Sequence, residues 1–185
     1  MTLIQELNAF QPCCEQEARD KELMLRYLAL FPDDILTREN PMAHITASAW
    51  VVTPKRDKVL MVYHKIYDSW SWTGGHADGE RDLLQVALRE VSEETGLTKL
   101  RPVTEEIWSL EILSVAPHVR RGEFVSAHLH LNVTYLIEAE ENEALCVNPD
   151  ENSGVRWFCA DEVIARSSEP EMRVIYRKLM EKLSK

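Results

Sequence analysis

The sequence predicts an α/β sandwich domain preceded by an N-terminal helical extension. After residue 40, segments rich in β-branched residues alternate with segments of helical periodicity, which is typical of α/β domains. No glycine occurs before Gly74, which favours helices over tight turns at the start of the chain. A long amphipathic helix is expected between Trp72 and Leu97, with glycines on both sides of it.

Residues 1–40 are expected to form the helical extension. A short helix is predicted from Leu3 to Phe10 and a longer, amphipathic one from Cys14 to Phe31. The apolar positions of the longer helix include Ala18, Leu23, Leu25, Leu28 and Leu30. This extension either packs on the domain or makes the contact of a homodimer, and the sequence leaves both open.

Residues 41–185 are expected to form the domain itself, which begins after Asn40-Pro41. Strands are predicted at 44–53, 59–63, 107–115, 123–138 and 155–159, and helices at 161–165 and 169–183. The basic segment Pro117–Gly122 is expected to be a loop between two of these strands.

Composition narrows the function classes. A chain of 185 residues suffices for one sizeable core, and its net charge of −10 argues against broad binding to nucleic acid. No apolar run reaches the ~20 residues that span a bilayer, and no leader is recognisable, so a cytoplasmic protein is expected. The four cysteines fit no zinc pattern and are expected to be reduced thiols, with Cys146 and Cys159 in the core.

The central helix carries an unusual charge pattern. Apolar side chains at Leu83, Leu84, Ala87, Leu88 and Val91 mark its buried face. Glu90, Glu93 and Glu94 share a second patch near its C-terminal end. Each like-charge pair at this spacing costs roughly 0.2–0.5 kcal/mol, and the helix dipole also disfavours anions there. A hard divalent cation would relieve this repulsion, so the pattern favours a metal site over a solvated acidic face.

Gly75 together with the segment Arg89–Leu97 resembles the Nudix box, G-x5-E-x7-R-E-U-x-E-E-x-G-U, where U is aliphatic. One position departs from it, because Arg81 stands where the box has an isolated Glu, and Glu80 lies one place earlier. The resemblance implies a Nudix-type α/β/α sandwich with a mixed sheet. It also implies a metal-dependent hydrolase that cleaves a phosphoanhydride bond in a nucleoside diphosphate linked to another moiety, X.

The chemistry assigns roles to particular side chains. Mg²⁺ or Mn²⁺ is expected on Glu90, Glu93 and Glu94 and, as the family implies, on the carbonyl of Gly75. Glu93 and Glu94 are the expected catalytic residues, and the partner is a small nucleoside diphosphate derivative. The candidates for contact with the substrate are His76, Arg120, Arg121 and Trp72.

Three other residues have two interpretations. His128 and His130 point to one face of a strand, where a structural pair is favoured over a ligand set by about two to one. Glu151 is expected to be an ordinary loop acid rather than a base.

Two other function classes remain open. The stretch Ser69–His76 is similar to a segment of isopentenyl-diphosphate isomerases, but Thr73 and Gly74 occupy the place of their cysteine. A non-catalytic nucleotide-binding module is supported only by Arg81. The intact carboxylate patch argues against both.

Overall fold

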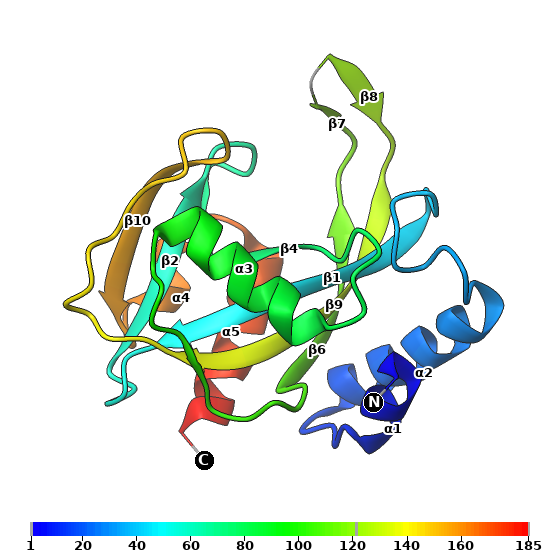
Figure 1. The fold of residues 1–185 in the computed structure, drawn as a ribbon, viewed down its shortest axis with the longest axis horizontal. Helices are drawn as coiled ribbons and strands as arrows, with labels where there is room; N and C mark the ends of the chain where they lie inside the picture. The colour runs from blue at the N-terminus through cyan, green and yellow to red at the C-terminus, as the bar shows by residue number, and fades with distance from the viewer. Residues whose placement is uncertain (1, 121, 185) are drawn as a thin grey trace.

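The computed structural model describes residues 2–120 and 122–184. These residues form a mixed eight-stranded sheet whose main path runs β10-β2-β1-β9-β5. Figure 1 shows helix α3 on one face of this sheet and helix α5 on the other. The predicted α/β sandwich with N-terminal helices is thereby confirmed.

The elements have the following bounds. The helices are α1 (Leu3–Ala9), α2 (Glu15–Leu30), α3 (Leu83–Thr95), α4 (Val163–Arg166) and α5 (Pro170–Leu183). The strands of the main sheet are β1 (Ala43–Val52), β2 (Lys58–His64), β3 (Ser69–Ser71), β4 (Thr73–His76), β5 (Arg101–Pro102), β6 (Ser109–Val115), β9 (His128–Glu138) and β10 (Asn152–Cys159). A separate hairpin consists of β7 (His118–Arg120) and β8 (Glu123–Val125).

Strand β1 is the centre of the sheet and is buried along its whole length. It pairs in parallel with β9, from Ala43 opposite Leu129 to Val52 opposite Glu138, and antiparallel with β2 and β4. Because successive side chains point to opposite faces, β1 serves two cores. One face carries Ile45, Ala47, Ala49 and Val51, and the other carries Trp50 and Val52.

The first core lies between the sheet and α3. Val86, Ala87 and Val91 of α3 are fully buried there. Leu7, Phe10, Met24, Leu28 and Ile35 join the same core from the N-terminal region. The N-terminal helices are thus part of the main core. Helix α2 packs against the core with the face that carries Met24, so Leu23 and Leu30 remain exposed. The expected apolar face of this helix is therefore wrong at these two positions.

The second core lies between the sheet and α5. Tyr176, Leu179 and Leu183 of α5 pack there against Trp50, with Val163 of α4 beside them. Within the described ranges, no helix has both the length and the apolar character needed to cross a membrane.

The single strand expected over 123–138 is wrong. It is interrupted after Val125 because β8 pairs with β7, whereas β9 pairs with β1 and β6. A change of partners requires a break between the two segments. The resulting β7–β8 hairpin projects from the molecule (Figure 1), so the basic segment expected as a loop contains a strand.

The cysteines are all free, but the expected burial of Cys146 and Cys159 is wrong because both are exposed.

Candidate active site

Local signals set the register of α3. Asp82 precedes the helix and accepts a hydrogen bond from the backbone N–H of Gln85 (3.1 Å). Gly96 follows it with φ 77°, a left-handed conformation that suits glycine. The helix therefore runs for 13 residues and presents Glu90, Glu93 and Glu94 on its last turns.

Glu94 is a buried carboxylate that joins three elements. Its side chain is 4% exposed. Oε1 accepts from the backbone N–H of Gly74 on β4 (2.9 Å), and Oε2 accepts from Nδ2 of Asn152 on β10 (2.8 Å). Burial raises the pKa of Glu94 to about 7, although both hydrogen bonds favour the charged form.

Glu90 lies directly against Gly75. A Cβ atom built on this glycine would be 2.4 Å from Cδ of Glu90, so only glycine leaves room for the carboxylate there. The Glu90 side chain is 14% exposed, and Nη2 of Arg89 is 3.3 Å from its Oε1. Burial raises the pKa of Glu90, which the arginine partly opposes.

The two glycines that precede α3 lie in a strand. Gly74 and Gly75 belong to β4 and pair with Ser48 and Ala47 of β1. A Cβ on Gly74 would lie 2.8 Å from the carbonyl oxygen of Ala47. The glycines thus permit close contact with β1 on one side and with Glu90 on the other.

Glu93 differs from its two neighbours by being open to solvent, with a side chain that is 59% exposed. Nε of Arg89 lies 3.8 Å from its Oε1, an ion pair at the i,i+4 spacing of a helix. Arg89 therefore lies between the carboxylates of Glu90 and Glu93.

Glu80 occupies the approach to α3, where the box Glu is replaced by Arg81. Its Oε1 accepts the backbone N–H groups of Arg81 (2.7 Å) and Asp82 (2.9 Å). These hydrogen bonds lower the pKa of Glu80, and the positive charge of Arg89 adds to the effect. Glu80 thus anchors the start of the helix through backbone contacts.

Glu151, at the end of the β9–β10 connection, and Asn152, the first residue of β10, complete the surroundings, and sequence reasoning missed the role of both. The charge of Glu151 contributes to the raised pKa values of Glu90 and Glu94, so it lies near the carboxylate patch. Asn152 is fully buried and holds Glu94 across a separation of 58 residues. No local pattern marks a partner at that distance.

These oxygen atoms fit a hard divalent cation. Two partly or fully buried carboxylates, a third exposed one and the backbone of Gly75 converge without a lysine among them. Oxygen-rich sets of this kind suit Mg²⁺ or Mn²⁺.

The candidates for substrate contact lie in different surroundings. Trp72 is 8% exposed and packs against Tyr176, which favours a core role for its ring. His76 ends β4 and joins a group of imidazole rings. Arg120 ends β7, and Arg121 lies outside the described residues.

Comparisons with known proteins agree on one family. The model of the NUDIX domain matches residues 42–183. A probable DHNTP pyrophosphohydrolase of Lactococcus lactis is 25% identical over 130 residues, which is 69% of this chain and 75% of that protein. An m7GpppN-mRNA hydrolase of Xenopus laevis is 31% identical over 114 residues, 58% of this chain but 36% of that protein.

Two solved structures share the fold. The Ap4A hydrolase of C. elegans superposes with a TM-score of 0.56 at 20% identity, covering 76% of this chain and 97% of that one. The dihydroneopterin triphosphate pyrophosphohydrolase of E. coli superposes with a TM-score of 0.53 at 14% identity, covering 74% and 94%.

Proposed function

Because the chain belongs to the Nudix family and is a pyrophosphohydrolase of the Nudix type, we propose that it uses Mg²⁺ or Mn²⁺ to hydrolyse a nucleoside diphosphate linked to a further moiety. The observation that carries this proposal is the convergence of Glu90 and Glu94 on the backbone of Gly74 and Gly75. A bound cation would offset the cost of placing two largely buried carboxylates beside a third.

The proposed ligands are Glu90, Glu93 and Glu94 with the carbonyl of Gly75. A bound divalent ion supplies charge neutralisation at the phosphate oxygens and lowers the pKa of a bound water. Ligand carboxylates must be ionised, so loading the site displaces the proton that Glu94 holds near neutral pH. Asn152 and Gly74 keep the Glu94 carboxylate in place during this change.

Glu93 is the proposed general base. Its exposed carboxylate can reach an attacking water, whereas both Glu94 oxygens are already hydrogen-bonded. Arg89 holds Glu93 near the other carboxylates by charge attraction. Glu94 is the proposed second catalytic residue, because its carboxylate, fixed by Gly74 and Asn152, would hold the metal ion that contacts the phosphate.

The relatives suggest which substrates to test first. Their names specify dihydroneopterin triphosphate, Ap4A and m7GpppN-mRNA, which all contain phosphoanhydride bonds. We propose a small nucleotide derivative for this chain. Arg120, at the end of β7, and Arg121, which lies outside the described residues, are the proposed phosphate contacts. His76 is a weaker candidate because it faces other imidazoles.

The test measures product release from these compounds, ADP-ribose, nucleotide sugars, NADH, NTPs and isopentenyl diphosphate, with Mg²⁺, Mn²⁺ or EDTA. We expect metal-dependent cleavage of one class. Glu93→Gln should lower turnover by about 10²–10⁴-fold, the usual contribution of a positioned base. Glu181→Gln, at an exposed position of α5, is the matched control and should leave turnover unchanged.

Equal turnover by wild type and Glu93→Gln would overturn the assignment of the base. Cleavage that persists in EDTA would overturn the role of the metal. Conversion of isopentenyl diphosphate without hydrolysis would favour the isomerase class instead.

A further inference from the structure

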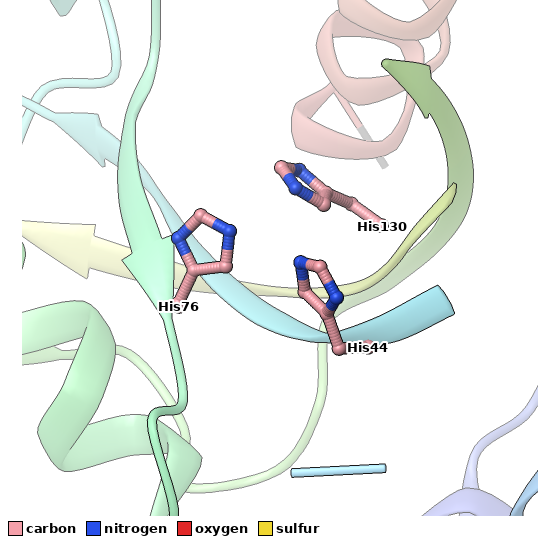
Figure 2. A group of neighbouring side chains, drawn as sticks. All are labelled: His44, His76 and His130. Carbon is pink, nitrogen blue, oxygen red and sulfur yellow. The ribbon is translucent and has the colours of Figure 1, made fainter. Parts of the chain in front are cut away.

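Five of the six histidines gather in one place, outside the carboxylate site. The rings of His76, His128 and His130 have centroids 4.9, 5.0 and 5.1 Å from that of His44. His118, on the hairpin, lies at the edge, 6.4 Å from His128. Figure 2 shows the rings of His44, His76 and His130 turned toward one another from three strands.

The register of the sheet brings these residues together. The parallel pairing of β1 and β9 places His44 opposite His130, and β4 places His76 opposite Thr46 of β1. Since side chains two residues apart on a strand share a face, His44 and Thr46 point the same way.

This face is the one opposite the carboxylates. A Cβ on Gly75 would meet Glu90, whereas a Cβ on Gly74 would meet Oγ of Ser48. Successive side chains along β4 point to opposite faces. His76, two residues after Gly74, therefore points to the same face as Gly74, the one that carries Ser48. The backbone of β4 thus separates the histidine group from the carboxylate patch.

Hydrogen bonds to backbone carbonyls set the tautomers. Nδ1 of His44 donates to the carbonyl of Asn40 (3.1 Å), and Nδ1 of His128 donates to that of Ser126 (2.9 Å), because a carbonyl can only accept. Nε2 of each ring therefore carries a lone pair. This is how histidines that bind metals are usually held.

The Nε2 lone pairs point into the group. Nε2 of His44 is buried and has no hydrogen-bond partner within residues 2–120 and 122–184. Nε2 of His128 lies 3.2 Å from Nε2 of His130. A buried, unpartnered acceptor facing other imidazoles is costly unless something binds there.

We propose that His44, His76 and His130 bind a divalent first-row transition ion of the Zn²⁺ type, with His128 beside them as a further nitrogen donor. One ligand atom from each of the three lies within 4.8 Å of the others. A tetrahedral Zn²⁺ with Zn–N bonds of about 2.0–2.1 Å holds its nitrogens roughly 3.3–3.4 Å apart, so small rotations of the three rings close the site. Nitrogen donors select such ions over Mg²⁺.

A metal at this position would link β1, β4 and β9 on the face of the sheet opposite the carboxylate patch. It would be a second ion, separate from the proposed Mg²⁺ or Mn²⁺. The three histidines come from positions 44, 76 and 130, so the site exists only in the folded chain.

The experiment titrates Co²⁺, a coloured substitute for Zn²⁺, into the metal-stripped, tag-free full chain. We expect one equivalent to bind with visible ligand-field absorption, to be displaced by Zn²⁺ and to resist excess Mg²⁺. His130→Gln and, independently, His76→Gln should weaken binding by at least about tenfold, the lower end of the loss for second-shell changes.

Two controls separate this site from the carboxylate site. His64→Gln makes the same change at the histidine outside the group and should bind Co²⁺ as wild type does. The pair Glu93→Gln and Glu94→Gln should lose hydrolysis and keep the Co²⁺ spectrum. Absence of ligand-field absorption in wild type, or equal affinity in folded His130→Gln and His76→Gln, would overturn the proposal whatever the hydrolase assay shows.

Discussion

At the scale of single residues, the protonation of Glu94 links stability, metal binding and pH. Burial raises its pKa from an ordinary value of 4.5 to about 7 in the folded, metal-free protein. The folded state therefore binds a proton more tightly than the unfolded chain. Glu94 contributes stability that is complete below pH 4.5 and is lost as the pH rises through 7.

We therefore expect Glu94→Gln to stabilise the metal-free protein at pH 8 relative to pH 5. At about 1.36 kcal/mol per pKa unit, the gain is at most about 3 kcal/mol. The new amide can accept from Gly74, and Asn152 can flip to offer its unpartnered Oδ1. The measurement is urea unfolding in EDTA at both pH values. A difference between the two proteins that does not change with pH would contradict this account.

The two glycines of β4 should respond differently to alanine. Gly75→Ala pushes only the end of the flexible Glu90 side chain, so we expect turnover to fall by about 100-fold with little change in stability. Gly74→Ala meets backbone atoms of Ala47 and Ser48 and should cost about 1–3 kcal/mol. Paired assays of turnover and thermal unfolding distinguish the two effects. Equal stability losses would contradict the assigned directions of the two positions.

The sequence sufficed for those site residues that lie close together along the chain. Glu90, Glu93 and Glu94 share one helix, and the spacing of a helix is readable from sequence. The hydrogen bond of Asn152 to Glu94 spans 58 residues, and the strand pairing of His44 with His130 spans 86, and no local pattern contains contacts of this kind. For the same reason, the expected structural pair of His128 and His130 left out His44 and His76.

At the scale of elements, a buried charge network joins α2, β6 and α5. Nζ of Lys178 lies 2.9 Å from Glu111 and 3.4 Å from Glu17, and Nζ of Lys182 lies 2.9 Å from Glu17. Both carboxylates are essentially unexposed. The burial of Glu17 explains why the docked face of α2 departs from its apolar pattern.

Removing one lysine from this network should destabilise the folded protein. Lys178→Met leaves Glu111 with hydroxyl and amide donors only, and breaking a buried pair costs about 3–5 kcal/mol. We expect the free energy of unfolding, measured by urea titration, to fall by that amount, with a lower midpoint. Lys55→Met, in the exposed turn before β2, is the control and should leave the midpoint unchanged. A small effect of Lys178→Met would mean that water already screens the network.

At the scale of the whole molecule, the N-terminal region and the domain share one core. Ile45 N–H donates to the carbonyl of Ile35 and Gly79 N–H to that of Leu36, so the connection also holds the start of β1 and the approach to α3. The division into residues 1–40 and 41–185 stays a prediction. The NUDIX match begins at residue 42, whereas the first core also includes side chains from before that residue.

Deletion of residues 1–40 should therefore abolish stable folding. It removes Leu7, Met24, Leu28 and Ile35 from the first core, and each large-to-small loss in a core costs about 2–5 kcal/mol. Near-ultraviolet circular dichroism of the truncated chain is the measurement. A cooperative unfolding transition at the wild-type temperature would establish residues 41–185 as an independent domain.

The parallel pairing of β1 with β9 also has a consequence for biosynthesis. Leu129 follows its partner Ala43 by 86 residues. At synthesis rates of about 5–20 residues per second, a ribosome needs roughly 4–17 s to deliver the missing strand. Throughout that interval one edge of the most buried strand has no partner. A nascent chain in this state is a natural client for chaperones, and its yield on expression should depend on how fast the segment between the two strands is translated.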